Sequence, residues 1–312
     1  MSSTDIMQRF IFDKTDIRGE LVSLQSSYSE ILNYNVLPSV IQTLLGEFIA
    51  AVSLLTSNLK FEGRITLQAR GDGPLPLIMA ECTHLKALRA VARPDDDVDW
   101  AALETATFTQ LIGKGMLVII IEPAQGQRYQ GVVPLDADDL AGCLEHYFDQ
   151  SEQLPTRLWL AADSQSKTAG GLFLQAMPAS SLNSSLNSSL SSLSKTQEQS
   201  NPCKSNQDRW ETVTTLAATV KNEELLTLPH EQLLYRLFHE EKVRLFDSVE
   251  LHFQCSCSFE RSGKALISLG HKEVQDMLKA QGEINIDCQF CNQHYSFSEK
   301  QVAILFPGNN LH

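Results

Sequence analysis

The sequence predicts an α+β fold made of a mixed α/β N-terminal core domain, a helical linker and a small C-terminal domain with clustered cysteines. Strand-like segments occur before and between helical segments without a regular βαβ rhythm, which is typical of α+β proteins. A serine-rich stretch interrupts this pattern, and two close pairs of cysteines follow it. We therefore divide the chain into a core domain (1–178), a flexible insertion (179–207), a helical linker (208–251) and a C-terminal domain (252–312).

The core domain is expected to combine one long helix with several strands. Pro38 suits the first turn of a helix over 38–59. The segment 63–81 alternates apolar and polar residues and turns at 71–74, which indicates a hairpin. Apolar residues at helical spacing predict a second helix over 138–151. Further strands are expected at 9–13, 18–24, 115–123 (as a buried strand), 127–135, 157–162 and 171–177.

The insertion and the linker differ in composition. Serine is by far the commonest residue in 179–207, which favours a flexible segment, with Cys203 as an exposed thiol that binds no metal. In the linker, Asp208 and Glu211 match a capping box at a helix start. The apolar linker residues share helix faces, which predicts either ordinary core packing or a detachable cover; they are Trp210, Val213, Leu216, Ala217, Val220, Leu233, Leu234, Leu237 and Phe238.

Composition also bears on partners and compartment. The formal net charge of −13 argues against nucleic acid and against an anionic membrane surface, because both attract clustered lysine and arginine. The N-terminus lacks the pattern of a secretory leader. The apolar segment 40–55 contains Gln42 and Glu47, so we expect a buried helix rather than a membrane span. A cytoplasmic protein is predicted, in which clustered cysteines indicate metal or redox chemistry.

The four clustered cysteines have the spacing of a metal site. Cys255 and Cys257 enclose one residue, thirty residues follow, and Cys288 and Cys291 enclose two. Two such pairs can supply four thiolates to one tetrahedral ion at roughly 2.3 Å, and thiolates select Zn²⁺ over hard cations. An iron–sulfur centre or a chance pattern are the alternatives. Four thiolates leave no open coordination position, so hydrolytic zinc chemistry is not expected.

Residues around the cysteines are assigned supporting roles. His252, His271 and His294 lie nearby in the sequence, but we expect them at the surface or behind the ligands, because four cysteines fill the shell. Asn292 follows the second pair, where zinc turns often need a left-handed residue that asparagine tolerates. A domain of about 60 residues supplies only about 3–5 kcal/mol from its core, whereas structural zinc contributes roughly 10–16 kcal/mol. The ion is therefore expected to decide whether this domain folds.

The cysteine pattern resembles the redox-regulated thirty-three-kilodalton heat-shock chaperonin family of bacteria. The resemblance extends over nearly the whole chain, and its other motifs are RGELV (18–22), SLLTSNLKFEGRITLQARGDGP (53–74), RYQGVV (128–133), SEQLPTRL (151–158), EELLTLP (223–229) and HEEKV (239–243). Two departures are the serine-rich insertion and Asn292, which stands where the family usually has glycine.

The resemblance implies an ATP-independent holdase that is inactive when reduced and zinc-bound. Peroxide with heat, or hypochlorous acid, would oxidise the ligands to the disulfides Cys288–Cys291 and then Cys255–Cys257 and release zinc. Such disulfides close only short loops, so the thirty-residue segment would lose its tie. The C-terminal domain and linker would unfold, and the protein would form a homodimer and bind unfolding client proteins.

Two other functions, and a purely structural role for the zinc site, stay open at this point. A thiol–disulfide oxidoreductase could use Cys288 and Cys291, but the preceding EINID segment reads as a strand, whereas reactive pairs of this kind sit at helix N-termini. A zinc-ribbon nucleic-acid binder is disfavoured by the balanced charge of 252–312. A purely structural zinc site would use the same four residues. No phosphate-binding loop is present, no enzymatic activity is expected, and Cys82 and Cys143 are predicted to be packing residues.

Overall fold

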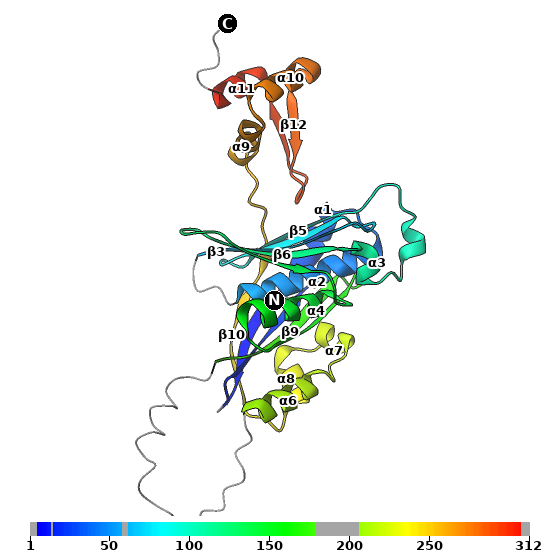
Figure 1. The fold of residues 1–312 in the computed structure, drawn as a ribbon, viewed down its shortest axis with the longest axis vertical. Coiled ribbons are helices and arrows are strands. Elements are labelled where there is room, and N and C mark those ends of the chain that lie inside the picture. Colours follow the sequence, from blue (N-terminus) through cyan, green and yellow to red (C-terminus); the bar gives the residue numbers. More distant parts are fainter. Residues whose placement is uncertain (1–4, 14, 58–61, 179–205, 307–312) are drawn as a thin grey trace, which may run out of the picture.

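The computed structural model describes residues 5–13, 15–57, 62–178 and 206–306. The predicted insertion 179–207, except its last two residues, and Cys203 lie outside the described residues. Figure 1 shows a layered core in the middle of the molecule, helices α6, α7 and α8 at one end, and a small C-terminal unit at the other. The predicted α+β class is confirmed, since strands and helices alternate irregularly along the chain.

An antiparallel sheet and a mixed sheet form the core. The first sheet has the strand order β10-β1-β2-β9-β8, and the second sheet has the order β11-β5-β4-β3-β6-β7. The strands of the first sheet are β1 (Ile6–Phe12), β2 (Ile17–Leu24), β8 (Thr156–Asp163), β9 (Thr168–Ala176) and β10 (Val243–Glu250). Those of the second sheet are β3 (Gly63–Gly71), β4 (Leu77–Thr83), β5 (Ala87–Arg93), β6 (Gly115–Pro123), β7 (Tyr129–Pro134) and β11 (His252–Phe253).

Helix α2 (Ser39–Thr56) lies between the two sheets and contacts strands of both. It is long and apolar enough to cross a membrane by composition alone, but 72% of it is buried inside the protein. A helix with so few polar residues needs cover on most of its surface, and the two sheets supply it. The predicted buried helix is confirmed. Pro38 occupies the N-cap with φ −55°, one position before the first turn in which the sequence placed it.

The remaining elements of the core are short. They are α1 (Ser26–Tyr34), α3 (Phe108–Ile112), α4 (Leu140–Tyr147), a 3₁₀ turn (Trp100–Leu103) and a π turn (Phe148–Glu152). The predicted hairpin over 63–81 is confirmed, because β3 pairs antiparallel with β4 across the glycine-rich turn. The prediction that 115–123 is a buried strand is only half right, since within β6 only Leu117 and Ile119 are fully buried. Neither α1 nor β5 was predicted.

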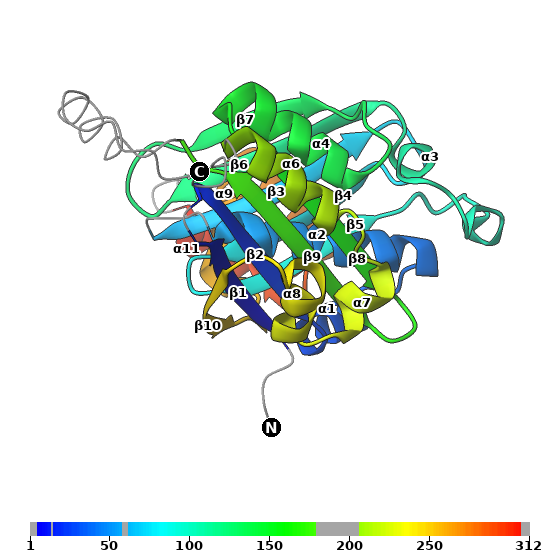
Figure 2. The same cartoon turned by 90° about the horizontal axis from the view of Figure 1, so that it is seen from below.

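Three helices cover the outer face of the first sheet: α6 (Asn206–Ala217), α7 (Asn222–Thr227) and α8 (His230–Phe238). We call them the helical cover, and Figure 2 shows them lying across β2, β8 and β9. Their apolar faces pack against a buried patch of the sheet, as the sequence predicted, and the patch consists of Phe10, Phe12, Ile17, Leu21, Ala161, Leu172 and Leu174. The two faces of the first sheet are therefore buried by different parts of the chain, α2 on one side and the cover on the other.

Two details of the linker prediction are wrong. Helix α6 begins at Asn206, so Asp208 lies in its first turn and is not the N-cap. The helical interpretation of 208–251 fails for Val243–Glu250, which forms β10 and pairs antiparallel with β1. Strand β1 lies near the N-terminus, far from β10 in the sequence, so the local pattern could not reveal this pairing.

The C-terminal unit has a small core of its own. Its elements are α9 (Phe259–Leu269), α10 (His271–Gln281), β12 (Ile284–Asp287), β13 (His294–Phe297) and α11 (Glu299–Leu305), with β12 and β13 paired antiparallel. Its fully buried apolar side chains are Leu266, Val274, Leu278, Ile284, Phe297 and Val302. This set is small, so the unit needs another source of stability.

A single extended segment joins the helical cover to the C-terminal unit. Strand β10 continues from the end of the cover along β1, and β11 then pairs in parallel with β5 in the second sheet. The amides of His252 and Gln254 donate hydrogen bonds to the carbonyls of Lys86 and Leu88. Cys255 follows directly, so the cysteines and the cover are connected through paired backbone.

Substitution of Phe238 should loosen the helical cover selectively. Its ring packs edge-on against Phe12 at 5.0 Å between centroids and is 1% exposed. We expect Phe238→Ala to weaken docking of the cover by about 3–5 kcal/mol, because a large cavity opens in its core. Tyr235→Ala on the same helix is the matched control, since Tyr235 is 75% exposed. Hydrogen exchange of α6–α8 should accelerate only in Phe238→Ala; equal exchange in both variants would contradict this packing.

The cover should also loosen at acidic pH because of His230. Its Nδ1 donates to Gln8 Oε1 (3.1 Å) and its Nε2 accepts from Ser23 Oγ (3.0 Å), and burial lowers the pKa of His230 to about 4. As the pH falls, the imidazole of His230 is protonated first in the unfolded state. The free energy of unfolding that His230 contributes is therefore fully present above pH about 6.5 and is lost toward pH 4. Denaturant titrations at pH 7 and 4.5 should show that the wild type loses about 2–3 kcal/mol more than His230→Gln. Equal losses in both proteins would rule out this role for His230.

Candidate metal centre

Two turns bring the four clustered cysteines together. Cys255 and Cys257 lie between β11 and α9, and Cys288 and Cys291 lie in the tight turn between β12 and β13. The amide of Asn292 donates to the carbonyl of Cys288 at 2.8 Å, which closes the second turn. Asn292 has φ 54°, so the predicted left-handed conformation is confirmed. In this conformation the backbone can reverse direction at once after the second pair.

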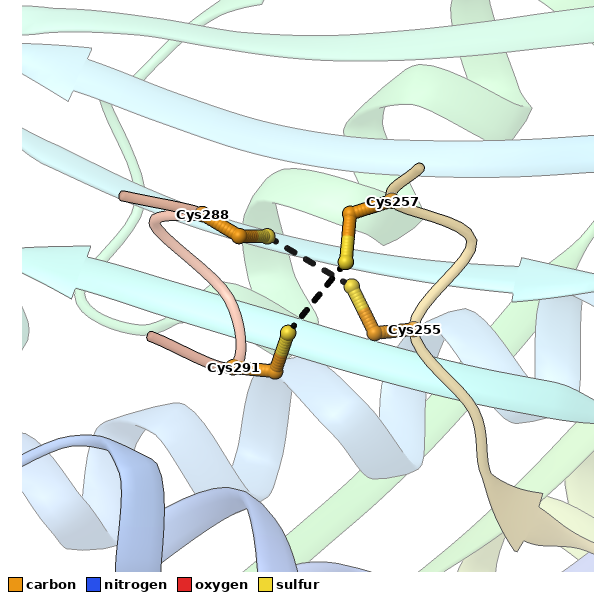
Figure 3. A group of neighbouring side chains, drawn as sticks. All are labelled: Cys255, Cys257, Cys288 and Cys291. Carbon is orange, nitrogen blue, oxygen red and sulfur yellow. Dashed lines mark hydrogen bonds between the residues drawn. The ribbon is translucent and has the colours of Figure 1, made fainter. Parts of the chain in front are cut away.

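The four sulfur atoms lie at distances that suit one ion. All of them are within 4.8 Å of one another, with 3.6 Å between the Sγ atoms of Cys255 and Cys288 and 3.4 Å between those of Cys257 and Cys291. Four ligands at about 2.3 Å around a tetrahedral ion would be about 3.8 Å apart. Figure 3 shows the four side chains pointing toward a common centre. These separations are far longer than a disulfide bond of about 2.05 Å, so the arrangement is that of a tetrathiolate ligand set.

The nearby histidines stand outside this ligand set. Among the described residues, the group that could hold a metal contains four cysteines and no histidine. His294 is exposed and its Nδ1 lies 2.7 Å from Asp287 Oδ1, an ion pair when the imidazole is protonated. His252 is exposed beside β5, and His271 is half-buried at the start of α10.

The environment of two of the thiols raises their pKa, so a cation is needed to hold all four as thiolates. Burial raises the pKa of Cys255 and of Cys291, so both resist deprotonation on their own. Burial also acts on Cys257, but the Tyr295 hydroxyl donates to its Sγ at 3.1 Å, and together with neighbouring thiols this holds the pKa of Cys257 below its usual value. A bound cation would stabilise all four thiolates and displace their protons, so metal binding here must be pH-dependent.

Arg89 on β5 touches both halves of the ligand set. Its Nη1 lies 4.0 Å from Cys255 Sγ, and its guanidinium lies over the ring of Phe290, 4.1 Å from the ring centre. Phe290 sits between Cys288 and Cys291 in the sequence. The same guanidinium donates from Nε and Nη2 to Glu81 Oε2 at 2.7 and 2.6 Å. Arg89 therefore connects both cysteine turns to the second sheet.

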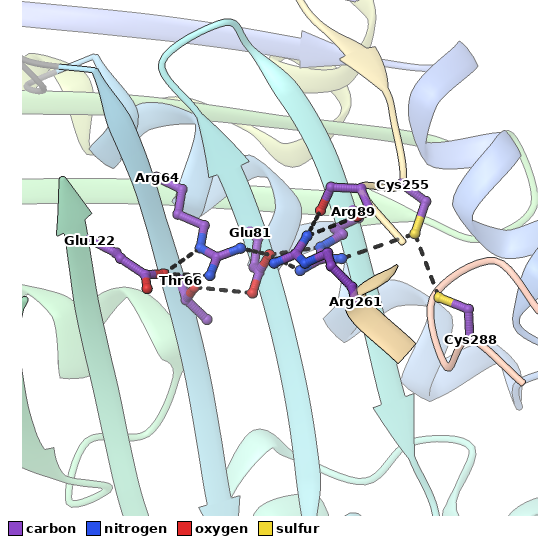
Figure 4. A network of polar contacts seen from close by, with 9 residues as sticks. Arg64, Thr66, Glu81, Arg89, Glu122, Cys255, Arg261 and Cys288 are labelled. Atoms are coloured by element: carbon purple, nitrogen blue, oxygen red, sulfur yellow. Dashed lines mark hydrogen bonds and ion pairs between the residues drawn. The ribbon is translucent and has the colours of Figure 1, made fainter. Parts of the chain in front are cut away.

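Glu81 is itself held by a row of polar residues across the second sheet. Thr66 Oγ1 donates to Glu81 at 3.2 Å, and Arg64 lies 3.9 Å from Glu81 while donating from Nε to Glu122 at 2.6 Å. Figure 4 shows this row running from Glu122 to Cys255. On the other side, Arg261 of α9 donates to the carbonyl of Ser256 at 2.8 Å. The sequence does not predict this network, because its only local signal is charged residues inside otherwise apolar strands.

Two further contacts fasten the centre to α1. The Asn292 side-chain amide donates to the carbonyl of Tyr34 at 2.8 Å, and the ring of Tyr34 stacks on Phe253 at 5.3 Å between centroids. Tyr34 is the last residue of α1, so its carbonyl has no partner within the helix. The metal centre is thus docked on the core through side chains on both cysteine segments.

The other described cysteines are packed in the main core and are not part of the ligand set. Cys82 and Cys143 are both fully buried in the main core, as predicted. Burial raises the pKa of Cys82 to about 11 and also raises the pKa of Cys143, so both stay protonated. They pack as small apolar side chains.

Comparison with known proteins gives one consistent family. The family model described as "Hsp33 protein" matches residues 5–298. A 33 kDa chaperonin of Ectopseudomonas mendocina is 47% identical over 305 residues, covering 97% of this chain and 96% of that protein. A 33 kDa chaperonin of Shewanella frigidimarina is 42% identical and covers 99% and 98%. A crystal structure of the 33 kDa chaperonin (heat shock protein 33 homolog) of Thermotoga maritima, 24% identical, matches with a TM-score of 0.76, covering 96% and 97%, and so shares the fold.

Loss of one thiol should abolish tight metal binding. We expect Cys257→Ser to weaken zinc affinity by about 100-fold or more. The whole site binds zinc with roughly 10–16 kcal/mol, and each of the four ligands contributes part of that free energy. Cys203→Ser is the control, since Cys203 is outside the spacing pattern. Competition with a chromophoric chelator under reducing conditions measures both variants. Wild-type affinity in Cys257→Ser would refute the four-cysteine site.

Proposed function

The chain belongs to the Hsp33 protein family, and from this premise we propose that it is a redox-regulated, ATP-independent holdase. It would bind unfolding proteins and prevent their aggregation under oxidative and heat stress. The family is a chaperone family, and the curated relatives named above are chaperonins that match over nearly the full chain. The convergence of four thiols from two turns is the observation that carries the redox part of the proposal.

In the reduced state, Cys255, Cys257, Cys288 and Cys291 would hold one Zn²⁺. The donor set supports this assignment, because four sulfurs at this spacing favour zinc over hard cations. The ion would supply structural stabilisation and no catalysis. It would tie the residues before α9 to the hairpin after α10, across a unit whose own core is small. The domain limits 1–178, 179–207, 208–251 and 252–312 belong to the same proposal.

Oxidation of the ligands would switch the protein on. Each neighbouring pair of thiolates, Cys255–Cys257 and Cys288–Cys291, would form one S–S bond and give up two electrons. One peroxide takes up these two electrons and two protons from solvent and leaves as two water molecules, whereas one hypochlorous acid takes up the two electrons and one proton and leaves as chloride and water. Disulfide sulfurs are neutral and no longer ligate as thiolates, so the four side chains would release the ion.

The extended segment 243–253 would carry this change to the helical cover. It runs from the end of α8 along β1 and β5 to Cys255. Unfolding of the C-terminal unit would therefore remove the structure that holds one end of this segment. The cover helices have 12, 6 and 9 residues and are too short to persist once they leave the sheet. Their departure would expose the apolar patch around Phe10 and Leu172, which, with the unfolded linker, would bind clients.

The assembly and location follow from the same scheme. The partners are unfolded or partly unfolded client proteins, and the oxidised protein would form a homodimer, without nucleic acid or membrane. A cytoplasmic location and the lack of enzymatic activity remain predictions. The oxidoreductase alternative is disfavoured because Cys288 and Cys291 lie between two strands rather than at a helix N-terminus.

Suppression of aggregation tests this function directly. A heat-unfolding client protein, followed by light scattering without ATP, should stay clear with protein oxidised by peroxide at elevated temperature. The reduced, zinc-loaded protein should leave scattering almost unchanged. Cys203→Ser should behave as the wild type in both states. Failure of the oxidised, zinc-free protein to suppress scattering would refute the holdase, and catalytic reduction of insulin disulfides would favour the oxidoreductase.

A further inference from the structure

Two residues that are not proposed ligands join the cysteine turns to the core. Arg89 comes from the second sheet and contacts Cys255 and Phe290, one residue on each side of the ligand set. Asn292 comes from the second cysteine turn and contacts the end of α1. Both contacts lie at the boundary between the C-terminal unit and the core, where Figure 1 shows the extended segment and the tip of the β12–β13 hairpin reaching the core.

The Arg89 guanidinium is held by a residue of the second sheet, independently of the cysteines. Its side chain is 12% exposed and that of Glu81 is 11% exposed, and two of its nitrogens are bonded to the same carboxylate oxygen. Turning away would leave Glu81 as a buried charge without this partner, which is unfavourable. The remaining Nη1 and the face of the guanidinium point at the cysteine turns, as Figure 4 shows for Cys255.

The charge of the centre depends on its redox state, whereas the charge of Arg89 does not. Four thiolates around one Zn²⁺ carry a net negative charge, so the guanidinium is attracted to the reduced centre. Two disulfides carry no charge, and the attraction then disappears. Disulfide formation between Cys288 and Cys291 must also reshape the turn that presents Phe290, because the two sulfurs have to approach to about 2.05 Å.

Asn292 combines a backbone role with a docking role. Its φ of 54° makes the tight turn, and its side-chain amide satisfies the Tyr34 carbonyl at the C-terminus of α1. Glycine would adopt the same backbone conformation without strain but would have no amide to donate. The side-chain contact can therefore be removed while the metal-binding turn is kept.

We propose that Arg89 and Asn292 form a redox-dependent latch that holds the reduced metal centre on the core and so restrains the helical cover. The latch is a regulatory part of the proposed holdase and rests on that function. Both are positioning residues, because they act through the cysteine turns and through β11 rather than on a client. Release of the latch would free β11 from β5 and allow the extended segment to move.

Hydrogen exchange in the reduced, zinc-loaded full-length protein tests the latch. In Asn292→Gly, the amides of His252 and Gln254 should exchange about tenfold faster than in the wild type, because one hydrogen bond is lost. Zinc affinity, measured by chelator competition, should stay within about threefold. Gln289→Gly is the matched control, because Gln289 is exposed in the same turn, and it should exchange as the wild type does.

Variants of Arg89 test the charge. Arg89→Gln should accelerate exchange of the same amides by about 10- to 100-fold, and Arg89→Lys should lie between it and the wild type, because lysine keeps the charge but not the planar fork. After oxidation, all variants should exchange alike. Wild-type exchange in reduced Asn292→Gly, or equal acceleration in both redox states, would overturn the latch. The exchange experiments contain no client protein. If they give the expected pattern while the oxidised protein fails to suppress client aggregation, the proposed function is refuted and the latch is not.

Discussion

The approach of four sulfur atoms to one point is the constraint on which the C-terminal unit depends. Two turns that are thirty residues apart meet there, with all Sγ atoms within 4.8 Å. The unit has few buried side chains, and its two strands have only four residues each. A structure of this size does not hold itself together by burial alone. A cation that cancels the mutual repulsion of the thiolates would therefore also set the stability of the whole unit.

The two faces of the first sheet are buried by different parts of the chain, as the proposed switch requires. Helix α2 fills the space between the sheets, and most of its residues are buried there. The helical cover buries only the outer face of the first sheet, with short helices that depend on docking. Under the proposed function only the face under the cover would be uncovered, and the cover connects through β10 and β11 to the cysteines.

Local sequence patterns were sufficient for the parts of the structure that local chemistry determines. Four features could be predicted because each depends on residues close in the sequence. They are the grouping of the four cysteines, the left-handed Asn292, the hairpin over 63–81 and the apolar faces of the cover. The metal itself stays a prediction. Strand β10 could not be predicted, since its pairing partner β1 is at the other end of the chain.

The surroundings of the metal centre show the same limit. The contacts of Arg89 with Glu81 and Phe290 join three segments that only the folded chain brings together. The same holds for the bond from Asn292 to Tyr34. Sequence spacing thus predicts which residues can bind an ion, whereas the residues that couple the ion to the core emerge only from the fold.

The most direct test follows zinc release and segment-resolved hydrogen exchange in one oxidant titration. The account predicts that residues 254–306 and the cover helices lose protection over the same range in which zinc is released, while α2 remains protected. A C-terminal unit that stays protected after its zinc has gone and its four cysteines have formed disulfides would contradict it.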